Sequence, residues 1–134
     1  MTDAYHINSR MDHRGGCGFE ENTGDGAGIL TAISHKFFQK TLAELGITLP
    51  EPQAYSIGNV FLPNNPEERA HCKRVMERII QEEGQQCLGF REVPICPDEA
   101  NIGPAARDAM PFIEQVVIEG SKTTDNAFDR ALYL

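Results

Sequence analysis

The sequence predicts a mixed α/β fold, in which helices and strands alternate along one modest domain. Apolar residues recur at helical spacing in one long, well-capped segment, and short strand-like segments are bounded by proline or glycine. No internal repeat or low-complexity stretch interrupts the alternation. With 134 residues and 40% apolar content, the chain is long enough for one domain and too short for two.

Two helices are expected in the first third of the chain. The first would close at Met11, and the second would run over residues 34–45. Ser34 suits the N-cap position of the second helix, and Gly46 suits its end. The apolar face of this helix would hold Phe38, Leu42 and Leu45.

The middle of the chain predicts a strand followed by the clearest helix. The strand would span 54–62, between Pro52 and Pro63. The helix has Asn65 as its N-cap and Pro66 at its first position, and it ends near Gly84. We expect its stripe to pack on a core and not to form a groove for a partner. The stripe consists of Cys72, Val75, Met76, Ile79, Ile80 and Glu83.

The last third predicts two strands, over 87–93 and 112–119, with a Pro/Gly-rich connection over 94–104 and a short helix over 105–109 between them. A further helix is expected to begin near Asp125, because Phe128, Leu132 and Tyr133 add apolar groups there. Helices as short as this one and the N-terminal one are marginal without tertiary support. Both ends therefore suggest that the chain is a piece of a larger domain.

Composition excludes several classes of function. Lys and Arg number 12 against 20 Asp and Glu, a net charge of −8, and no basic stripe offsets it, so nucleic-acid binding is not expected. No apolar run reaches the ~20 residues that cross a bilayer, and the acidic start lacks the basic segment of a secretion signal. We therefore expect a cytoplasmic protein. The four cysteines show no C-x-x-C spacing and the histidines no ligand spacing, so no metal site is predicted. His6, His35 and His71 are expected to face the solvent.

Glycines concentrate in residues 11–29, which hold six of the chain's twelve. Such density lets other groups approach the backbone closely. Gly24, Gly26 and Gly28 could in principle cradle a phosphate, but their G-x-G-x-G spacing is neither a dinucleotide fingerprint nor a P-loop. Asp25 would also oppose an anion. A nucleotide-binding loop is therefore the weaker interpretation of this segment.

The same segment resembles the class II, N-terminal-nucleophile glutamine amidotransferases. The resemblance rests on His13-Arg14-Gly15 followed by Asp25-Gly26-Ala27-Gly28-Ile29. The longer insert, from Thr23 onward, is similar to the glutamate synthase branch of that family. Further blocks look like glutamate synthase in the same order, among them 60–63, 88–94, 103–107, 111–116 and 128–133.

The resemblance implies part of a four-layer αββα fold and a glutaminase chemistry. In the family, an N-terminal cysteine attacks the amide of L-glutamine, its own α-amino group acts as the base, and a glutamyl thioester forms and is hydrolysed. The ammonia then serves glutamate synthesis from 2-oxoglutarate in a synthase domain that carries FMN and an iron–sulfur cluster. No cofactor is expected within this segment itself.

The resemblance carries over supporting residues and no catalytic one. The matching family Arg helps to hold the nucleophile, so Arg14 and Gly15 would support the site from one side, and Asp25 and Gly26 from the other. The nucleophile would precede Arg14 by some 20 to 30 residues, given a strand of ~6 and a helix of ~12 residues. Only thirteen residues precede Arg14, and the first cysteine is Cys17. Neither Cys17, an internal thiol, nor Thr2, too close to Arg14, fits the role.

Residues 1–134 are thus expected to be a partial amidotransferase domain without the nucleophile strand and the C-terminal part. By itself the polypeptide would be inactive, and its partner would be the remainder of a glutamate synthase chain. The alternative is a non-catalytic split subunit or interaction module that completes the site of a complementary chain. An unpaired sheet edge would invite self-association in either case.

Overall fold

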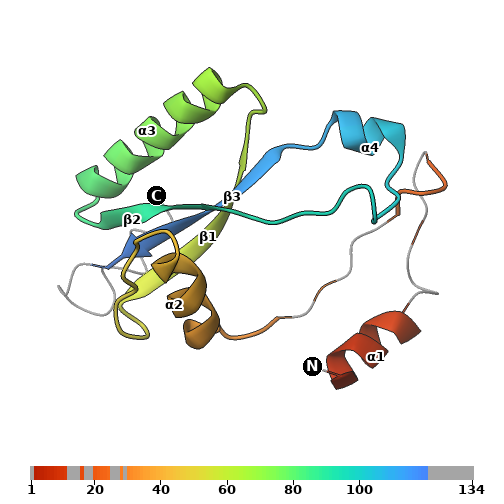
Figure 1. Ribbon diagram of the computed structural model, residues 1–134, viewed down its shortest axis with the longest axis horizontal. Coiled ribbons are helices and arrows are strands. Elements are labelled where there is room, and N and C mark those ends of the chain that lie inside the picture. Colours follow the sequence, from red (N-terminus) through yellow and green to blue (C-terminus); the bar gives the residue numbers. More distant parts are fainter. Residues whose placement is uncertain (1, 12–15, 17–19, 25–27, 29, 121–134) are drawn as a thin grey trace. The chain divides into compact units, whose positions relative to one another are not determined.

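The computed structural model describes residues 2–11, 16, 20–24, 28 and 30–120. The alternation of helices and strands is as predicted (Figure 1). The elements are α1 (Thr2–Arg10), α2 (His35–Ala43), β1 (Tyr55–Leu62), α3 (Pro66–Glu82), β2 (Gln86–Glu92), α4 (Pro104–Asp108) and β3 (Phe112–Glu119). The helix expected from Asp125 lies outside the described residues.

The chain divides into two compact units. The first combines Met1–Ile33 with Ile95–Met110 and contains α1 and α4. The second combines Ser34–Pro94 with Pro111–Leu134 and contains the remaining five elements. Each unit is assembled from segments that are distant in sequence, so neither is formed by a single continuous stretch.

The second unit is built on a three-stranded antiparallel sheet in the order β1-β3-β2. The last strand of the sequence, β3, is therefore the central one. It pairs with β1 from Tyr55↔Glu119 to Leu62↔Phe112, and with β2 in a register that shifts between Cys87 and Gly89. Both β1 and β2 are edges of this sheet.

One helix covers each face of the sheet (Figure 1). On one face, Leu42 of α2 packs with Tyr55 and Val117, and together with Leu49 these residues form the buried core cluster. On the other face, Lys73 of α3 pairs with Glu114. Val117 and Glu114 project to opposite sides because they are an odd number of residues apart on one strand. The described part of the second unit thus forms a helix–sheet–helix arrangement, and the second sheet of a four-layer fold stays a prediction.

The α2 helix begins after Ser34, as predicted, and ends earlier than predicted. It ends at Ala43, and Gly46 adopts a φ of 75° beyond it, as a helix-terminating glycine should. Ser34 occupies the N-cap but makes no side-chain capping bond within the described residues. Leu45, expected on the apolar face, is 55% exposed because the helix has already ended there.

The start of α3 is as predicted. Asn65 accepts hydrogen bonds on its side-chain oxygen from the amides of Glu67, at 2.9 Å, and Glu68, at 3.2 Å. Pro66 occupies the first turn, where a missing amide hydrogen costs nothing. Two backbone N–H groups at this end of the helix have no partner within the helix, and one side chain therefore binds both.

Replacing Asn65 by alanine is expected to lower the free energy of unfolding by about 1 kcal/mol, because both capping bonds are lost. Urea denaturation followed by circular dichroism measures this loss. Asn65→Asp keeps an acceptor oxygen and should stay within about 0.5 kcal/mol of the parent. Equal stability of the alanine variant and the parent would contradict a capping role.

The apolar stripe of α3 is only partly buried, which corrects the expectation of a core face. Ile80 is 8% exposed and Ile79 is 40% exposed. Cys72, Val75 and Met76 are half-buried and line a groove beside the helix. The periodicity identified an apolar face correctly, but the described part of the second unit covers only the side of it that touches the sheet.

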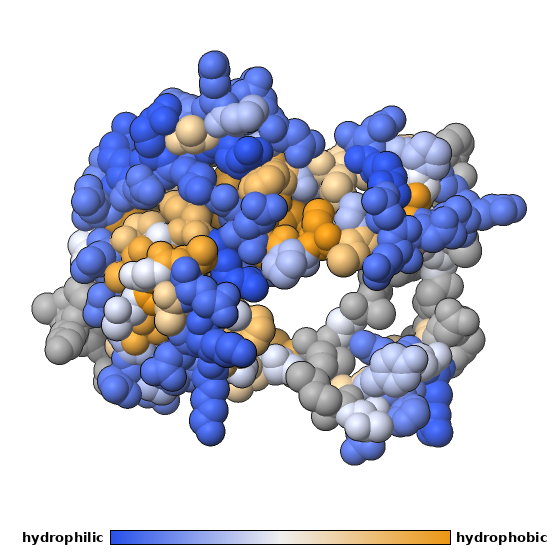
Figure 2. Space-filling model, viewed as in Figure 1, coloured by the Kyte–Doolittle hydropathy of each residue, from blue (hydrophilic) through white to orange (hydrophobic). Residues whose placement is uncertain are grey.

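Apolar side chains gather in the band between α3 and α2, where the sheet lies, and polar side chains cover the outer surface of α3 (Figure 2). Within the described ranges, no helix has the length and apolar character needed to cross a membrane.

Candidate functional site

The residues that the sequence singles out for the site fall where the structure gives no description. Arg14 and Gly15 lie in 12–15, and Asp25 and Gly26 lie in 25–27. Cys17, already considered unsuited as a nucleophile, is also outside the described residues. Their neighbours Gly16 and Gly24 are among the described residues.

Gly16 and Gly24 come into close contact. A Cβ atom added to Gly24 would lie 3.0 Å from the carbonyl oxygen of Gly16, which is tighter than most contacts of real Cβ atoms. The chain at position 24 therefore returns to position 16, and residues 20–24 are the described part of this loop. Glycine suits position 24 because a side chain there would crowd the backbone at position 16.

Glu20, within this loop, binds the start of α4. Its Oε1 accepts a hydrogen bond from the amide of Ala105 at 2.8 Å, and its Oε2 accepts a longer one from Ala106 at 3.4 Å. The N-cap position of α4 is Gly103, which has no side chain to offer. Glu20 thus caps this helix from a segment more than 80 residues earlier in the chain.

Thr23 completes the same contact. Its hydroxyl donates to Glu20 Oε2 at 3.0 Å and accepts from the amide of Gly103 at 3.0 Å. One hydroxyl therefore links the carboxylate to the backbone just before α4. Together, Glu20 and Thr23 fasten the loop between Gly16 and Gly24 to residues 103–106, and we refer to them as the Glu20–Thr23 clasp.

The clasp lowers the pKa of Glu20 below its ordinary value. The hydrogen bond from Ala105 is the largest cause, with smaller contributions from Thr23 and Ala106, while partial desolvation acts in the opposite direction. Hydrogen bonds to the ionised form favour that form. The carboxylate is therefore held charged against the amides at the start of α4.

Acidification is expected to open the clasp only at a pH below the ordinary range for glutamate. Because the folded-state pKa is lowered, the contribution of Glu20 is complete above the unfolded value and is lost as the pH falls through the folded one. The amide resonances of Ala105 and Ala106 should report this titration in two-dimensional NMR. In Glu20→Gln the titration should disappear, and its persistence there would assign it to another group.

A second polar contact shapes the segment before α4. Arg107 Nη1 lies 2.6 Å from Asp98 Oδ1, and Nη2 donates to the carbonyl of Pro97 at 3.1 Å. The Asp98 side chain is 90% exposed, so this pair adds little stability. Its effect is to fold the proline-containing connection back on the helix that follows.

The histidines do not gather into a site among the described residues. His6 and His71 are exposed, as expected. His35 differs from expectation, because it is half-buried and its Nδ1 lies 3.1 Å from the hydroxyl of Tyr55, whose pKa is raised by burial. The described part of the chain contains no group of three His, Cys, Asp or Glu residues that could hold a metal ion.

Sequence reasoning missed Glu20 and Thr23. Two features hinted at them: polar side chains three residues apart within a glycine-rich turn, and a Gly103-Pro104 helix start that lacks its own cap. What joins these two features is a contact between distant segments, which no local pattern predicts.

Comparison with known proteins places the whole chain in one family. Residues 1–134 match the model of the class-II glutamine amidotransferases. The chain is 40% identical over 127 residues to the glutamate synthase [NADPH] large chain of Bacillus subtilis, 93% of this chain and 8% of that one. It is 36% identical over 136 residues to ferredoxin-dependent glutamate synthase 1, chloroplastic/mitochondrial, of Arabidopsis thaliana, 100% of this chain and 8% of that one.

A third relative is the glutamate synthase [NADH] of Schizosaccharomyces pombe, 33% identical over 135 residues, which are 99% of this chain and 6% of that one. The chain thus spans less than a tenth of the length of the curated relatives it matches. The resemblance drawn from the Arg14 and Asp25 segments is confirmed at the level of the family. This chain belongs to the class-II glutamine amidotransferases.

Proposed function

We propose that these residues form part of the glutaminase portion of a glutamate synthase, which releases ammonia from L-glutamine for glutamate synthesis from 2-oxoglutarate. The observation that carries the proposal is the match of the whole chain to the class-II amidotransferase model, joined by relatives that are all named glutamate synthase. Those relatives differ in the electron donor that their names give, so the donor is left open.

Within this function, Arg14, Gly15, Asp25 and Gly26 support the nucleophile and do not replace it. The close approach of Gly16 and Gly24 favours this assignment, because these two glycines directly follow Gly15 and directly precede Asp25. The described positions next to the two supporting segments are thus in contact. The Glu20–Thr23 clasp then fastens the loop to residues 103–106.

The thiol itself must come from outside residues 1–134. The chemistry needs a cysteine whose α-amino group is free, and the first cysteine of this polypeptide is the internal Cys17. Assayed by itself, the polypeptide is therefore expected to release no glutamate from glutamine above the uncatalysed rate. The thiol would come from the remainder of a glutamate synthase chain or, as the second candidate, from a complementary subunit.

That the implied cofactors lie outside this segment stays a prediction. Cys72, Cys87 and Cys96 form no group of metal ligands, so they do not fit an iron–sulfur cluster. FMN and the cluster would reside in the synthase portion of the parent enzyme. A cytoplasmic location also stays a prediction, since one relative's name places it in chloroplasts and mitochondria.

A segment exchange tests the proposal. The matching residues of the Bacillus subtilis large chain, 40% identical, are replaced by this chain, and glutamine hydrolysis by the purified chimaera is measured. We expect hydrolysis to be retained. Arg14→Ala should then lower it about 100-fold, because misplacement of a reacting group by about 1 Å costs that much.

The exchange includes its own control. Arg74→Ala removes an exposed arginine on α3 and should leave hydrolysis unchanged. A second chimaera carries both Arg14→Ala and Asp25→Ala. If both chimaeras fold and bind glutamine but hydrolyse it at the same rate, the assignment of these two positions is refuted.

A further inference from the structure

The Glu20–Thr23 clasp depends on a third residue, Gly103. Gly103 is buried and has a φ of −65°, a value that residues of any type adopt, so its conformation does not require glycine. A Cβ atom added at this position would collide with the carboxylate of Glu20. The absence of a side chain at position 103 is therefore what lets this carboxylate reach the amides of Ala105 and Ala106.

The clasp joins one tight turn to a distant segment of the same compact unit. The amide of Thr23 donates to the carbonyl of Glu20 at 3.2 Å, so these two residues are the ends of the turn. Three hydrogen bonds then connect their side chains to the backbone of residues 103–106. The lowered pKa of Glu20 keeps its carboxylate ionised, and hydrogen bonds to an ionised acceptor are stronger than those between neutral groups.

The clasp stands next to both supporting segments along the chain. Only Gly24 separates Thr23 from Asp25, and Gly16, whose carbonyl oxygen contacts Gly24, directly follows Gly15. Consecutive Cα atoms are about 3.8 Å apart, so a fixed residue limits where its neighbours in the chain can lie. Fixing the turn to residues 103–106 therefore restrains the chain at the positions that adjoin these segments.

A glycine-rich segment needs such a restraint if it is to support a reaction. Residues 11–29 hold six of the chain's twelve glycines, and glycine has more backbone freedom to lose than any other residue. Groups that support a reacting atom work only when they are held within about 0.5 Å of the productive position. The side chains of Glu20 and Thr23 supply contacts that limit this freedom.

We propose that Glu20, Thr23 and Gly103 are positioning residues of the glutaminase site, which hold the segments of Arg14 and Asp25 in place. This inference rests on the proposed function. The three residues act through these segments and take no part in the bond changes. Their loss should lower kcat and kcat/KM for glutamine hydrolysis by the same factor, as expected for support that acts in the transition state.

The test uses the full-length chimaera in which this chain replaces the matching residues of the Bacillus subtilis large chain. Glu20→Ala, Thr23→Val and Gly103→Ala break the clasp from its three sides. Each should lower kcat about tenfold or more with KM changed less than about threefold, because misplacement by about 1 Å costs up to about 100-fold. Thr23→Ser keeps the hydroxyl and should stay within about twofold of the unchanged chimaera.

Coupling to the supporting residues separates positioning from a general structural role. In the chimaera that carries both Arg14→Ala and Asp25→Ala, Glu20→Ala should lower kcat by less than about threefold, because the groups that it positions are already absent. If Glu20→Ala lowers kcat by the same factor in both backgrounds, the clasp acts independently of these residues and the proposal is wrong.

Asp98→Asn is the matched control. It weakens the exposed contact of Asp98 with Arg107 of α4 and leaves the clasp intact, so hydrolysis should not change. A loss of kcat as large as that of Glu20→Ala would show that any loosening around α4 is sufficient, which would overturn the proposal. Circular dichroism verifies that each variant is folded, and Thr23→Val, which removes one hydroxyl, carries the test if Glu20→Ala is not.

Failure of this inference is distinguishable from failure of the proposed function. If Arg14→Ala lowers hydrolysis by the chimaera but the three clasp variants do not, the clasp has no positioning role and the proposed function stands. If Arg14→Ala also leaves hydrolysis unchanged, the assignment of the supporting residues itself is wrong.

Discussion

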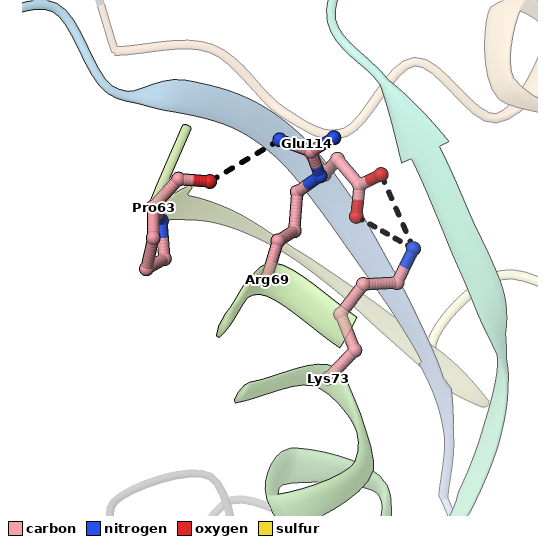
Figure 3. Close-up of polar contacts among 4 residues, drawn as sticks. All are labelled: Pro63, Arg69, Lys73 and Glu114. Atoms are coloured by element: carbon pink, nitrogen blue, oxygen red, sulfur yellow. Dashed lines mark hydrogen bonds and ion pairs between the residues drawn. The ribbon is translucent and has the colours of Figure 1, made fainter. Parts of the chain in front are cut away.

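Lys73→Met is expected to lower the free energy of unfolding by about 3 kcal/mol, at the lower end of the range for removing one partner of a buried ion pair. Lys73 Nζ lies 2.9 Å from Glu114 Oε2 and donates a hydrogen bond to Oε1 at 3.2 Å (Figure 3). Glu114 is 8% exposed on the central strand, so its charge would be left without compensation. Chemical denaturation monitored by circular dichroism measures the loss.

The surroundings of this pair explain why the loss should be large. Oε2 is at ion-pair distance from Nζ but accepts no hydrogen bond from the described residues, so the ion pair with Lys73 is its main compensating contact there. Lys73 also stands 4.4 Å from the centre of the Phe90 ring. Its neighbour Arg69 is already engaged, 3.8 Å from the ring centre of Phe112 and hydrogen-bonded to the carbonyl of Pro63.

A double variant separates the charge effect from the packing effect. Lys73→Met combined with Glu114→Leu removes both charges and should return the stability to within about 1 kcal/mol of the parent, because apolar replacement of a whole buried pair is often neutral. A double variant as unstable as Lys73→Met would show that packing, not the unpaired carboxylate, causes the loss. Arg78→Met, which disrupts an exposed pair with Glu82, should cost less than about 0.5 kcal/mol.

Gly89→Ala is expected to cost about 3 kcal/mol, through backbone strain and crowding together. Gly89 has a φ of 145°, a region that residues with a Cβ atom rarely adopt. It also follows the shift in the pairing of β2 with β3. A Cβ atom there would lie 2.8 Å from the Cδ1 of Ile47, so that side chain would have to rotate away from the core cluster.

Gly58→Ala is the matched control for this prediction. Gly58 lies on β1 without a positive φ, and its added Cβ would lie 3.6 Å from Val116 Cγ1, an ordinary contact. Its stability should change by no more than about 1 kcal/mol, and it can increase because glycine is unfavourable within strands. Thermal unfolding of both variants decides the matter, and equal losses would show that the strand, and not the conformation of Gly89, is responsible.

Local sequence patterns determined most of the element boundaries. The strand over 112–119 and the helix after Asn65 were predicted as they occur, because prolines, glycines and a side-chain cap fix the ends of these elements through short-range geometry. The family can also be identified from the sequence, because the segments around Arg14 and Asp25 have the ordered motifs of that family.

The structure decided what depends on contacts between distant residues. Three features depend on contacts between residues that are 20 or more positions apart in the chain. They are the central position of β3 in the sheet, the Glu20–Thr23 clasp and the half-buried His35. The stripe of α3 shows the difference most clearly. Its helical period reveals that one side is apolar, but only the neighbours present in three dimensions determine which of those residues are buried, because burial depends on what packs against the helix and not on its own sequence.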